Sequence, residues 1–522
     1  MSERPSRQGR RTVAAGSLTA AASAAWRSTA ANWLLVILMA AGLALRVTAQ
    51  ISYRPALLYI DSIKYLYNAY PGADPVGYKA PLRAILAVGN LGTVTAVQHL
   101  VGLALAATIY LVLIRWDVRR WLAAIAVAPL LLDAYQVQIE QNIMPDIWFE
   151  AAIVAGIAVL LARRDGPRLG AVIAGGLLLG ASATVRQIGE ILILPALVFV
   201  LAIGGGWRTM LTRGLALTAG FAVPVVGYMT GSLLVSGHFW LATATPSVST
   251  YGRMAVAADC ATLKIPAYAR PLCPTQEQRS HGVDWLDHDA SSPVKTYVAP
   301  PGMNRFAVIA SFDHQVLVQQ PGRVLVAMAA DGLKLFSLTR TSSQVGTPIS
   351  RWQFQDSYPT FPDWVTLGKG HRIVFGLRLQ PGGPIVTRHR LEPAYGGPAS
   401  VSKGPARFLR SYQLHGGYAP GPLMAVFAIT GFAGTLLVLF RRASLKRRQL
   451  AQACLLFFGT GAAVLIASDA FQFSWRYQLP ALITVPPAGV LGITVLLSYL
   501  RKRRDLEAET LAQAGEQVSL RD

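Results

Sequence analysis

The chain has 522 residues, of which 53% are hydrophobic and 14% charged, and its formal net charge is +22. Soluble globular proteins carry about 25% charged residues, so this composition excludes an ordinary soluble enzyme. The basic residues lie in short clusters between apolar segments and form no patch interleaved with aromatic residues, so no nucleic-acid partner is expected.

The apolar segments have the length that spans a bilayer, roughly 17–25 residues. The first follows a basic N-terminus and is too long for the core of a cleavable signal peptide, so we interpret it as a span. With orientations assigned by the positive-inside rule, the sequence predicts an all-α polytopic protein of the cell membrane, with about ten transmembrane helices and both termini cytoplasmic. The spans with two clear bounds are 33–49, 95–114, 121–132, 148–161, 191–203, 215–234 and 479–500, and three more end near 186, 441 and 469.

This alternation divides the chain into five regions. They are a basic cytoplasmic N-terminus (1–31), a transmembrane catalytic region with outer loops (32–237), a large extracytoplasmic region of mixed structure (238–420), C-terminal transmembrane helices (421–500) and a cytoplasmic tail (501–522). The large outer region carries more basic than acidic residues, which is compatible with its location because long translocated domains escape the positive-inside rule.

Three features of the large outer region predict local structure. Residues 306–336 look amphipathic and helical, with an interruption at Pro321, and such a segment suits a membrane surface. Residues 372–379 are expected to form short strands. Cys260 and Cys273 share an oxidising exterior, which favours a disulfide between them, and two unpaired thiols are the alternative.

Three acidic residues near predicted span ends are candidate catalytic groups. Asp61 follows the first span, and Glu140 and Asp146 follow the third. The predicted topology brings all three to the outer membrane face, where gathered carboxylates suit the deprotonation of a hydroxyl. Pro145 separates the two later acids, so they do not share a helix face. Solvated loop carboxylates without a catalytic role are the alternative.

Two arginines depart from the charge bias of the outer face. Arg186 and Arg476 each lie at an outer span end, where an arginine needs an acid, a lipid head group or a bound phosphate as its partner. Both are candidates for donor phosphate binding, because a guanidinium group binds phosphate through two parallel hydrogen bonds. Glu190 is an acid close to Arg186 in sequence, and an interfacial anchor is the alternative role for Arg476.

Further polar residues are candidates for contact with a substrate. Tyr65 follows Asp61 closely, and Gln98 and His99 begin the second span on the outer side, where a structural hydrogen bond is the alternative role of the histidine. No cysteine or histidine spacing resembles a zinc site, so no cofactor is required. A divalent cation between the acids and a phosphate is compatible with the same site.

The order of these groups resembles the GT-C superfamily of membrane glycosyltransferases, which includes protein O-mannosyltransferases and lipid A aminoarabinose transferases. The resemblance is carried by the segment 59–65, Gly77-Tyr78, the segment 138–146, Arg186 and Arg476-Tyr477, and it covers mostly the first 200 residues. It implies a GT-C-like arrangement of helices and a catalytic base at Asp61. Many members have paired acids in the first outer loop, whereas Asp61 lies between Ile60 and Ser62, so its partner acid would come from the second loop.

The resemblance also implies the reaction. The donor would be a polyprenyl-phosphate sugar, the acceptor a hydroxyl of a glycan, lipid or protein, and the transfer inverting, with membrane lipids around the helices. Two other classes remain open. A membrane transporter or lipid or polysaccharide flippase would also place charges in a helical bundle, although matching repeated halves are not evident here. A non-enzymatic envelope assembly protein would explain the large outer region but not the ordered polar residues at span ends.

Overall fold

The computed structural model describes residues 31–67, 75–242, 246–341, 347–358, 365–368, 372–375, 387–390, 396, 399–439 and 444–519. The predicted cytoplasmic N-terminus lies outside these residues apart from Ala31, and so do residues 376–379 of the predicted strand segment.

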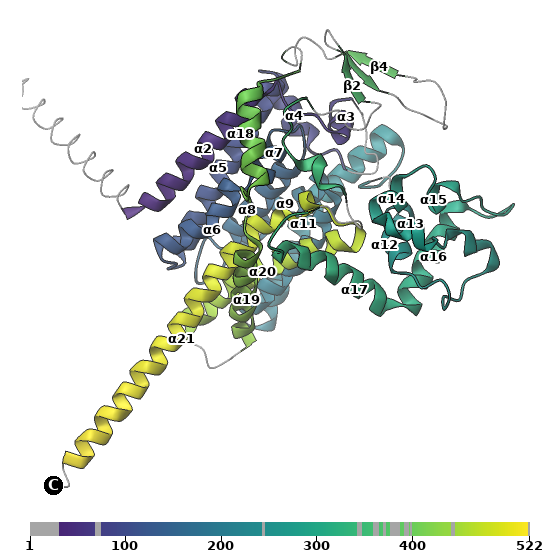
Figure 1. Cartoon of the computed structure of the whole chain (residues 1–522). Helices are drawn as coiled ribbons and strands as arrows, with labels where there is room; N and C mark the ends of the chain where they lie inside the picture. The colour runs from purple at the N-terminus through teal and green to yellow at the C-terminus, as the bar shows by residue number, and fades with distance from the viewer. Residues whose placement is uncertain are drawn as a thin grey trace, which may run out of the picture.

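Helices make up most of the described chain (Figure 1). The α-helices are α2 (Trp33–Ser52), α3 (Ile60–Tyr67), α4 (Lys79–Leu86), α5 (Leu91–Arg115), α6 (Arg120–Leu132), α7 (Ala134–Glu140), α8 (Asp146–Leu160), α9 (Leu169–Val185), α10 (Ile193–Ile203), α11 (Trp207–Ser236), α12 (Pro246–Ala257), α13 (Gln276–Ser280), α14 (Gly282–His288), α15 (Pro293–Thr296), α16 (Arg305–Gln319), α17 (Pro321–Gly332), α18 (Lys403–Leu414), α19 (Gly421–Leu436), α20 (Leu445–Phe471) and α21 (Pro480–Ser519). Short 3-10 helices are η1 (Gln187–Leu192), η2 (Ala267–Leu272), η3 (Leu333–Phe336), η4 (Ile349–Trp352), η6 (Leu437–Leu439) and η7 (Trp475–Gln478).

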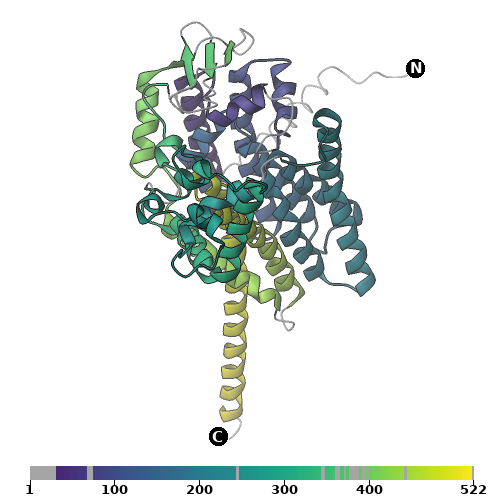
Figure 2. The same cartoon turned by 90° about the vertical axis from the view of Figure 1, so that its right-hand side faces the viewer.

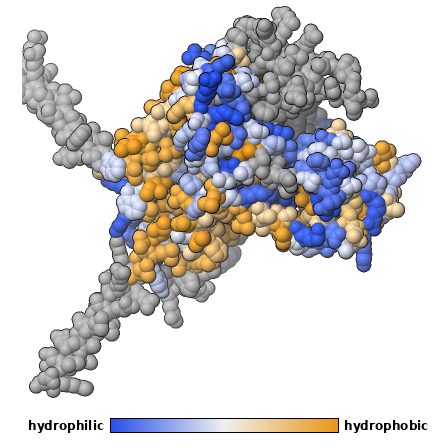
Figure 3. Space-filling model, in the orientation of Figure 1, coloured by the Kyte–Doolittle hydropathy of each residue, from blue (hydrophilic) through white to orange (hydrophobic). Residues whose placement is uncertain are grey.

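The described chain is an α-helical membrane protein. Five helical segments are long and apolar enough to cross a membrane, namely Trp33–Ser52, Leu91–Arg115, Trp207–Ser236, Leu445–Phe471 and Trp475–Leu500. A sixth span is possible if α6 and α7, which meet at 55°, are one broken span. Apolar side chains form a band over the bundle, whereas much of the peripheral helices α12–α17 is hydrophilic (Figure 3). Each of the ten predicted spans coincides with a helix, but α8, α9, α10 and α19 are short, so the number ten stays a prediction.

The bend between α6 and α7 follows from local sequence. Asp133 adopts an extended conformation that ends α6, and its carboxylate accepts a hydrogen bond from the Tyr135 amide at 2.9 Å, which caps α7. Helix α7 ends at Glu140, and α8 begins at Asp146 directly after Pro145, so the proline separates the two acids as predicted. The two acids therefore belong to different helices.

Small residues let the bundle helices approach closely. A side chain on Gly180 of α9 would meet the Phe221 carbonyl oxygen of α11 at 2.2 Å, and one on Gly492 of α21 would meet the Thr430 carbonyl oxygen of α19 at 2.0 Å. Close backbone contact of this kind replaces hydrophobic driving force inside a membrane. Helices α19, α20 and α21 pack together, and α21 continues beyond the bundle as a single helix (Figure 2).

Strands contribute little. Strand β1 (Tyr53–Arg54) pairs antiparallel with β5 (Ser400–Val401), with Tyr53 opposite Val401, and this ties the end of α2 to the start of α18. A three-stranded antiparallel sheet has the order β2 (Val365–Gly368), β3 (Arg372–Phe375) and β4 (Thr387–Arg390). The strand predicted at 372–379 is thus confirmed for its first four residues.

Helices α12–α17 form a peripheral domain with its own apolar core. The core includes Tyr251, Leu286, Ile309 and Phe312. The amphipathic segment predicted at 306–336 forms α16 and α17, which are separated at Pro321 as predicted. Its inner face packs into this core, and whether its outer face touches a membrane stays a prediction.

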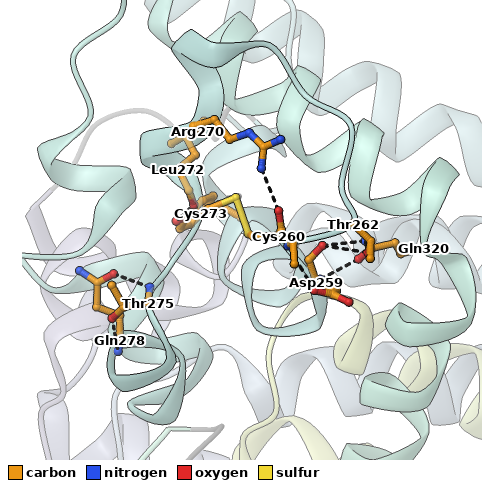
Figure 4. Close-up of a disulfide and its surroundings, with 11 residues drawn as sticks. Asp259, Cys260, Thr262, Arg270, Leu272, Cys273, Thr275, Gln278 and Gln320 are labelled. Carbon is orange, nitrogen blue, oxygen red and sulfur yellow. Dashed lines mark hydrogen bonds between the residues drawn. A yellow bond between two sulfur atoms is a disulfide. The ribbon is translucent and has the colours of Figure 1, made fainter.

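The predicted disulfide joins Cys260 and Cys273 in the peripheral domain (Figure 4). Around it, Arg270 donates to the Cys260 carbonyl at 2.8 Å, and the Gln320 amide donates to the Asp259 carbonyl at 2.9 Å. Closing a loop of this length stabilises a fold by about 3 kcal/mol in the chain-entropy model.

Within the peripheral domain, fully buried Arg253 of α12 contacts Asp331 of α17, and Lys334 contacts the same carboxylate. A hydrogen bond links this domain to the bundle. Gln472, after α20, donates to Asp284 at 2.8 Å. The segment that follows this domain is attached to the bundle by its own contacts, because the Thr347 amide donates to the Phe473 carbonyl at 3.1 Å and the Trp352 ring nitrogen donates to Ser474 Oγ at 3.1 Å.

Candidate active site

The candidate site starts with Asp61, in the first turn of the short helix α3. The Ser62 hydroxyl accepts a hydrogen bond from the Tyr59 amide at 2.9 Å, which fixes the start of this helix. The Asp61 side chain is 29% exposed, and one of its oxygens lies 3.7 Å from Lys64 Nζ. Asp61 is therefore an accessible carboxylate at one end of the bundle.

Asp146 lies behind Asp61 as the first residue of α8. Arg476 Nε lies 3.0 and 3.1 Å from its two carboxylate oxygens, and Arg476 Nη2 lies 2.9 Å from Oδ2. Arg186 Nη1 contacts Asp146 Oδ1 as well. The amino-terminal end of a helix favours a negative charge, so this carboxylate is stabilised by two guanidinium groups and by the dipole of α8.

Arg476 joins the two acids. Its Nη1 donates to Asp61 Oδ2 at 3.0 Å while its other nitrogens hold Asp146. We call Asp61, Asp146, Arg186 and Arg476 the ion cluster. Its members come from α3, from α8, from the end of α9 and from η7, and Asp61 and Arg476 are 415 positions apart.

Aromatic rings surround the guanidinium groups of the ion cluster. Arg476 lies 5.3 Å from the Trp352 ring centroid and 5.7 Å from that of Tyr477, and Arg186 lies 5.0 Å from the Tyr477 centroid. The Trp352 ring also packs on Tyr59 at 4.8 Å. Cation–π contact of this kind holds the arginines in fixed orientations.

The charges of this site are uneven. With Lys64 included, three cations surround two carboxylates, which leaves one net positive charge. Burial raises the pKa of Asp61, but Lys64 and Arg476 lower it more, to about 2. Burial raises the pKa of Tyr59 to about 12, so its hydroxyl keeps its proton. The site therefore presents an ionised, weakly basic carboxylate with a small excess of positive charge.

Glu140 lies in a different network. Its two oxygens accept hydrogen bonds from Arg46 Nε and Nη2, both at 2.8 Å, and Oε2 lies 2.9 Å from His99 Nδ1. Gln136 donates to Oε1 at 3.3 Å. Glu140 and Arg46 are fully buried, and a side chain on Gly102 would meet Glu140 Oε1 at 2.4 Å. We call Glu140, Arg46, His99 and Gln136 the Glu140 network.

The other predicted substrate residues have internal partners. The Gln98 amide donates to the carbonyls of Glu140 and Asn142 at 2.7 and 2.8 Å, and its oxygen accepts from the Tyr78 hydroxyl at 2.8 Å. The Tyr65 ring packs edge-on against Tyr78. His99 Nε2 is 2.8 Å from Gln141 Oε1. Gln98 and His99 are buried and hold the loop between α7 and α8 in place, whereas buried Tyr65 packs against Tyr78.

The structure thus brings together four of the predicted residues, Asp61, Asp146, Arg186 and Arg476, and gives Glu140, His99, Gln98 and Tyr65 other partners. Arg186 pairs with Asp146, whereas Glu190 is exposed. No arrangement of three or more His, Cys, Asp or Glu side chains suited to a metal ion occurs within the described residues.

Sequence reasoning missed two residues that shape these networks. Arg46 lies inside the first apolar span, and an ionisable residue within a span is itself a signal that a partner exists. The sequence around Trp352 does not indicate a role at the site, because its position beside Arg476 depends on the path of the chain after the peripheral domain. Glu150 lies inside the predicted span 148–161, where an acid needs a partner. Gln136 donates to its Oε2 at 2.9 Å, while Oε1 has no hydrogen-bond partner among the described residues.

Comparisons of this chain with protein-family models, with curated proteins and with solved structures find no match.

Proposed function

We propose that the chain is a membrane glycosyltransferase that moves a sugar from a polyprenyl-phosphate donor to an extracytoplasmic acceptor hydroxyl with inversion. The ion cluster is the observation that carries this proposal. It combines an accessible carboxylate with two guanidinium groups that converge behind it. A hydroxyl acceptor needs a base, and a phosphate leaving group needs cations, at adjacent positions.

The charge balance supports a monophosphate donor. A polyprenyl-phosphate sugar is a phosphodiester with one negative charge, which matches the single net positive charge of Lys64, Arg186, Arg476, Asp61 and Asp146. A diphosphate donor would bring more negative charge than this site balances. We assign Arg186 and Arg476 to the donor phosphate.

In the proposed reaction, the acceptor oxygen attacks the anomeric carbon and forms the new glycosidic bond as the bond from that carbon to the phosphate oxygen breaks. Asp61 takes the proton of the attacking hydroxyl. The leaving polyprenyl phosphate gains a second negative charge, and the two arginines stabilise that growing charge. Direct displacement inverts the configuration at the anomeric carbon.

Donor binding would also make Asp61 a stronger base. Arg476 donates to Asp61, and the carboxylate has a pKa of about 2. A phosphate that binds Arg476 and Lys64 would weaken the stabilisation that these cations give to the Asp61 carboxylate, and it would add a nearby negative charge. Both changes raise the pKa of a carboxyl group. Donor binding would therefore precede and activate proton removal.

Asp146 and Glu140 take other roles in this proposal. Asp146 already bonds both arginines, so it orients the phosphate-binding groups. Glu140 is fully buried with both oxygens occupied, so we assign it, with Gln98, His99 and Tyr65, to the support of the site.

We also propose ten spans, with the ion cluster on the extracytoplasmic side and the peripheral domain outside the cell membrane. The clusters at Arg115, Arg119 and Arg120, and at Arg163, Arg164 and Arg168, lie at span ends opposite the ion cluster, which supports this orientation.

The test is sugar transfer by the purified full chain in proteoliposomes. A panel of radiolabelled polyprenyl-phosphate hexoses and pentoses is incubated with glycan, lipid and protein fractions of a cell envelope. Transfer of label to one acceptor class, lost in Asp61→Asn, is the expected result. Movement of labelled donor across the bilayer without transfer to any acceptor would overturn the proposal in favour of a flippase.

A further inference from the structure

Two hollows lie between helices α2, α5, α6 and α8, at the end of the bundle away from the ion cluster. Their volumes are about 450 and 640 Å³, and both are lined by Leu111, Ile114 and Arg120. The larger hollow touches Ala158 in the last turn of α8, whereas the ion cluster includes the first residue of this 15-residue helix. At a rise of 1.5 Å per residue, about 20 Å of helix separates the two sites.

The hollows combine apolar walls with unneutralised basic groups. Leu35, Val36 and Ala107 line the smaller hollow, and Val112, Val118 and Leu161 line the larger. Arg120 lines both hollows and Arg115 lines the larger one.

Both of these arginines are exposed, and neither forms an ion pair with an acid among the described residues. The acid of the same loop, Asp117, is occupied by Arg164 and by Lys446, each at 2.6 Å. Two positive charges therefore remain at the mouth of an apolar depression.

We propose that these hollows bind one anionic phospholipid of the cytoplasmic leaflet, with its phosphate at Arg115 and Arg120 and its acyl chains along the apolar walls. The hollows have the volume typical of ligand sites, roughly 300–1,000 Å³. Basic pockets between transmembrane helices on the cytoplasmic side suit anionic head groups. The inference rests on the proposed membrane orientation and not on the proposed reaction, because the ion cluster takes no part in it.

The neighbouring Arg119 supplies a matched control. It belongs to the same basic cluster and is also exposed, but it lines neither hollow. General attraction of a basic loop to an anionic membrane would depend on all three arginines, whereas a defined site depends on Arg115 and Arg120 alone.

The experiment is native mass spectrometry of the purified full chain, titrated with phosphatidylglycerol or with neutral phosphatidylcholine. We expect wild type to retain one phosphatidylglycerol in preference to phosphatidylcholine. Each of Arg115→Gln and Arg120→Gln should weaken retention about fivefold, the usual effect of one basic residue near an anionic lipid. Arg119→Gln should leave retention unchanged. Ala158→Trp should lower retention by filling the larger hollow without changing any charge.

Thermal unfolding of each variant, compared with wild type, checks that the variant is folded. Ala158→Trp tests the volume of the larger hollow, whereas the arginine variants test its charge. An equal loss in Arg119→Gln would overturn the proposal and show diffuse charge attraction. Equal retention of phosphatidylcholine would also overturn the proposal. Preferential retention of polyprenyl phosphate would overturn it as well, because the hollows would then bind the polyprenyl carrier lipid instead of a phospholipid.

Discussion

The ion cluster and the Glu140 network both pair carboxylates with arginines, but they differ in how completely burial and hydrogen bonds satisfy the carboxylates. In the Glu140 network a fully buried carboxylate has Arg46, His99 and Gln136 on its two oxygens. In the ion cluster Asp61 is 29% exposed and shares Arg476 with Asp146. A buried, fully paired acid holds helices together, whereas a partly open one can exchange its partner for a substrate. Under the proposed function, the extent of pairing and burial, rather than residue type, distinguishes the supporting network from the proposed catalytic one.

The largest effect expected from this comparison is on the proposed role of Asp61 as the catalytic base. Asp61→Asn keeps the shape and removes the basic carboxylate, so turnover should fall about 10²–10⁴-fold, the usual contribution of general-base catalysis. Donor binding should persist, because the arginines remain. The measurement is transfer from a radiolabelled polyprenyl-phosphate sugar together with donor retention on the purified chain. Turnover close to that of wild type would remove Asp61 from the role of base.

Breaking the Glu140 network should instead lower stability. Glu140→Gln leaves the Arg46 guanidinium buried without its charge partner, and losing one member of such a pair costs about 3–5 kcal/mol of the free energy of unfolding. Thermal and denaturant unfolding measure this loss.

The double variant Arg46→Met/Glu140→Leu sharpens this test, because replacing a buried ion pair by apolar residues is often nearly neutral. It should regain much of the lost stability and catalyse transfer. A stable but inactive double variant would return Glu140 to the catalytic groups.

Arg186→Ala should affect both donor binding and turnover. It removes one cation from the ion cluster but leaves Arg476 on Asp146. Removal of one preorganised donor to a developing negative charge typically lowers turnover about 10²–10³-fold. Steady-state kinetics should show a higher KM for the donor together with a lower kcat. Arg168→Ala, at the opposite bundle end, is the control, and an unchanged KM in Arg186→Ala would contradict the assignment to the donor phosphate.

The smallest expected effect is the acid dependence of stability. The folded pKa of Asp61 is about 2, below the unfolded value of about 3.9. A depressed carboxyl pKa stabilises the fold above the unfolded pKa, and this contribution disappears as the pH falls through the folded pKa. It amounts to at most about 2.6 kcal/mol, lost as the pH falls from about 4 to about 2. Unfolding measured over this range should show a smaller acid-dependent loss in Asp61→Asn than in wild type, and equal losses would contradict the ion pairing of Asp61.

Much of the local structure could be predicted from the sequence. Apolar segments predicted the helices, and Pro145 and Pro321 predicted where the helical segments are interrupted. The location of Cys260 and Cys273 in one predicted outer region favoured the disulfide that joins them. These features depend on neighbouring residues, on backbone sterics and on the apolar character of a short segment, and a short stretch of sequence determines all three.

The sequence also placed polar groups at the ends of spans, but only the tertiary structure decided which of them meet. Arg476 reaches Asp61 and Asp146 across 415 and 330 positions, and Arg46 reaches Glu140 across 94. No local sequence feature distinguishes Asp61, which is partly exposed, from Glu140, which is fully buried. Burial and pairing of these charges depend on the packing of α2, α5, α7 and α8. They also depend on the position of Trp352, which follows the peripheral domain in the chain. Hydropathy fixes which segments enter the membrane, whereas long-range packing fixes which charges remain available for chemistry.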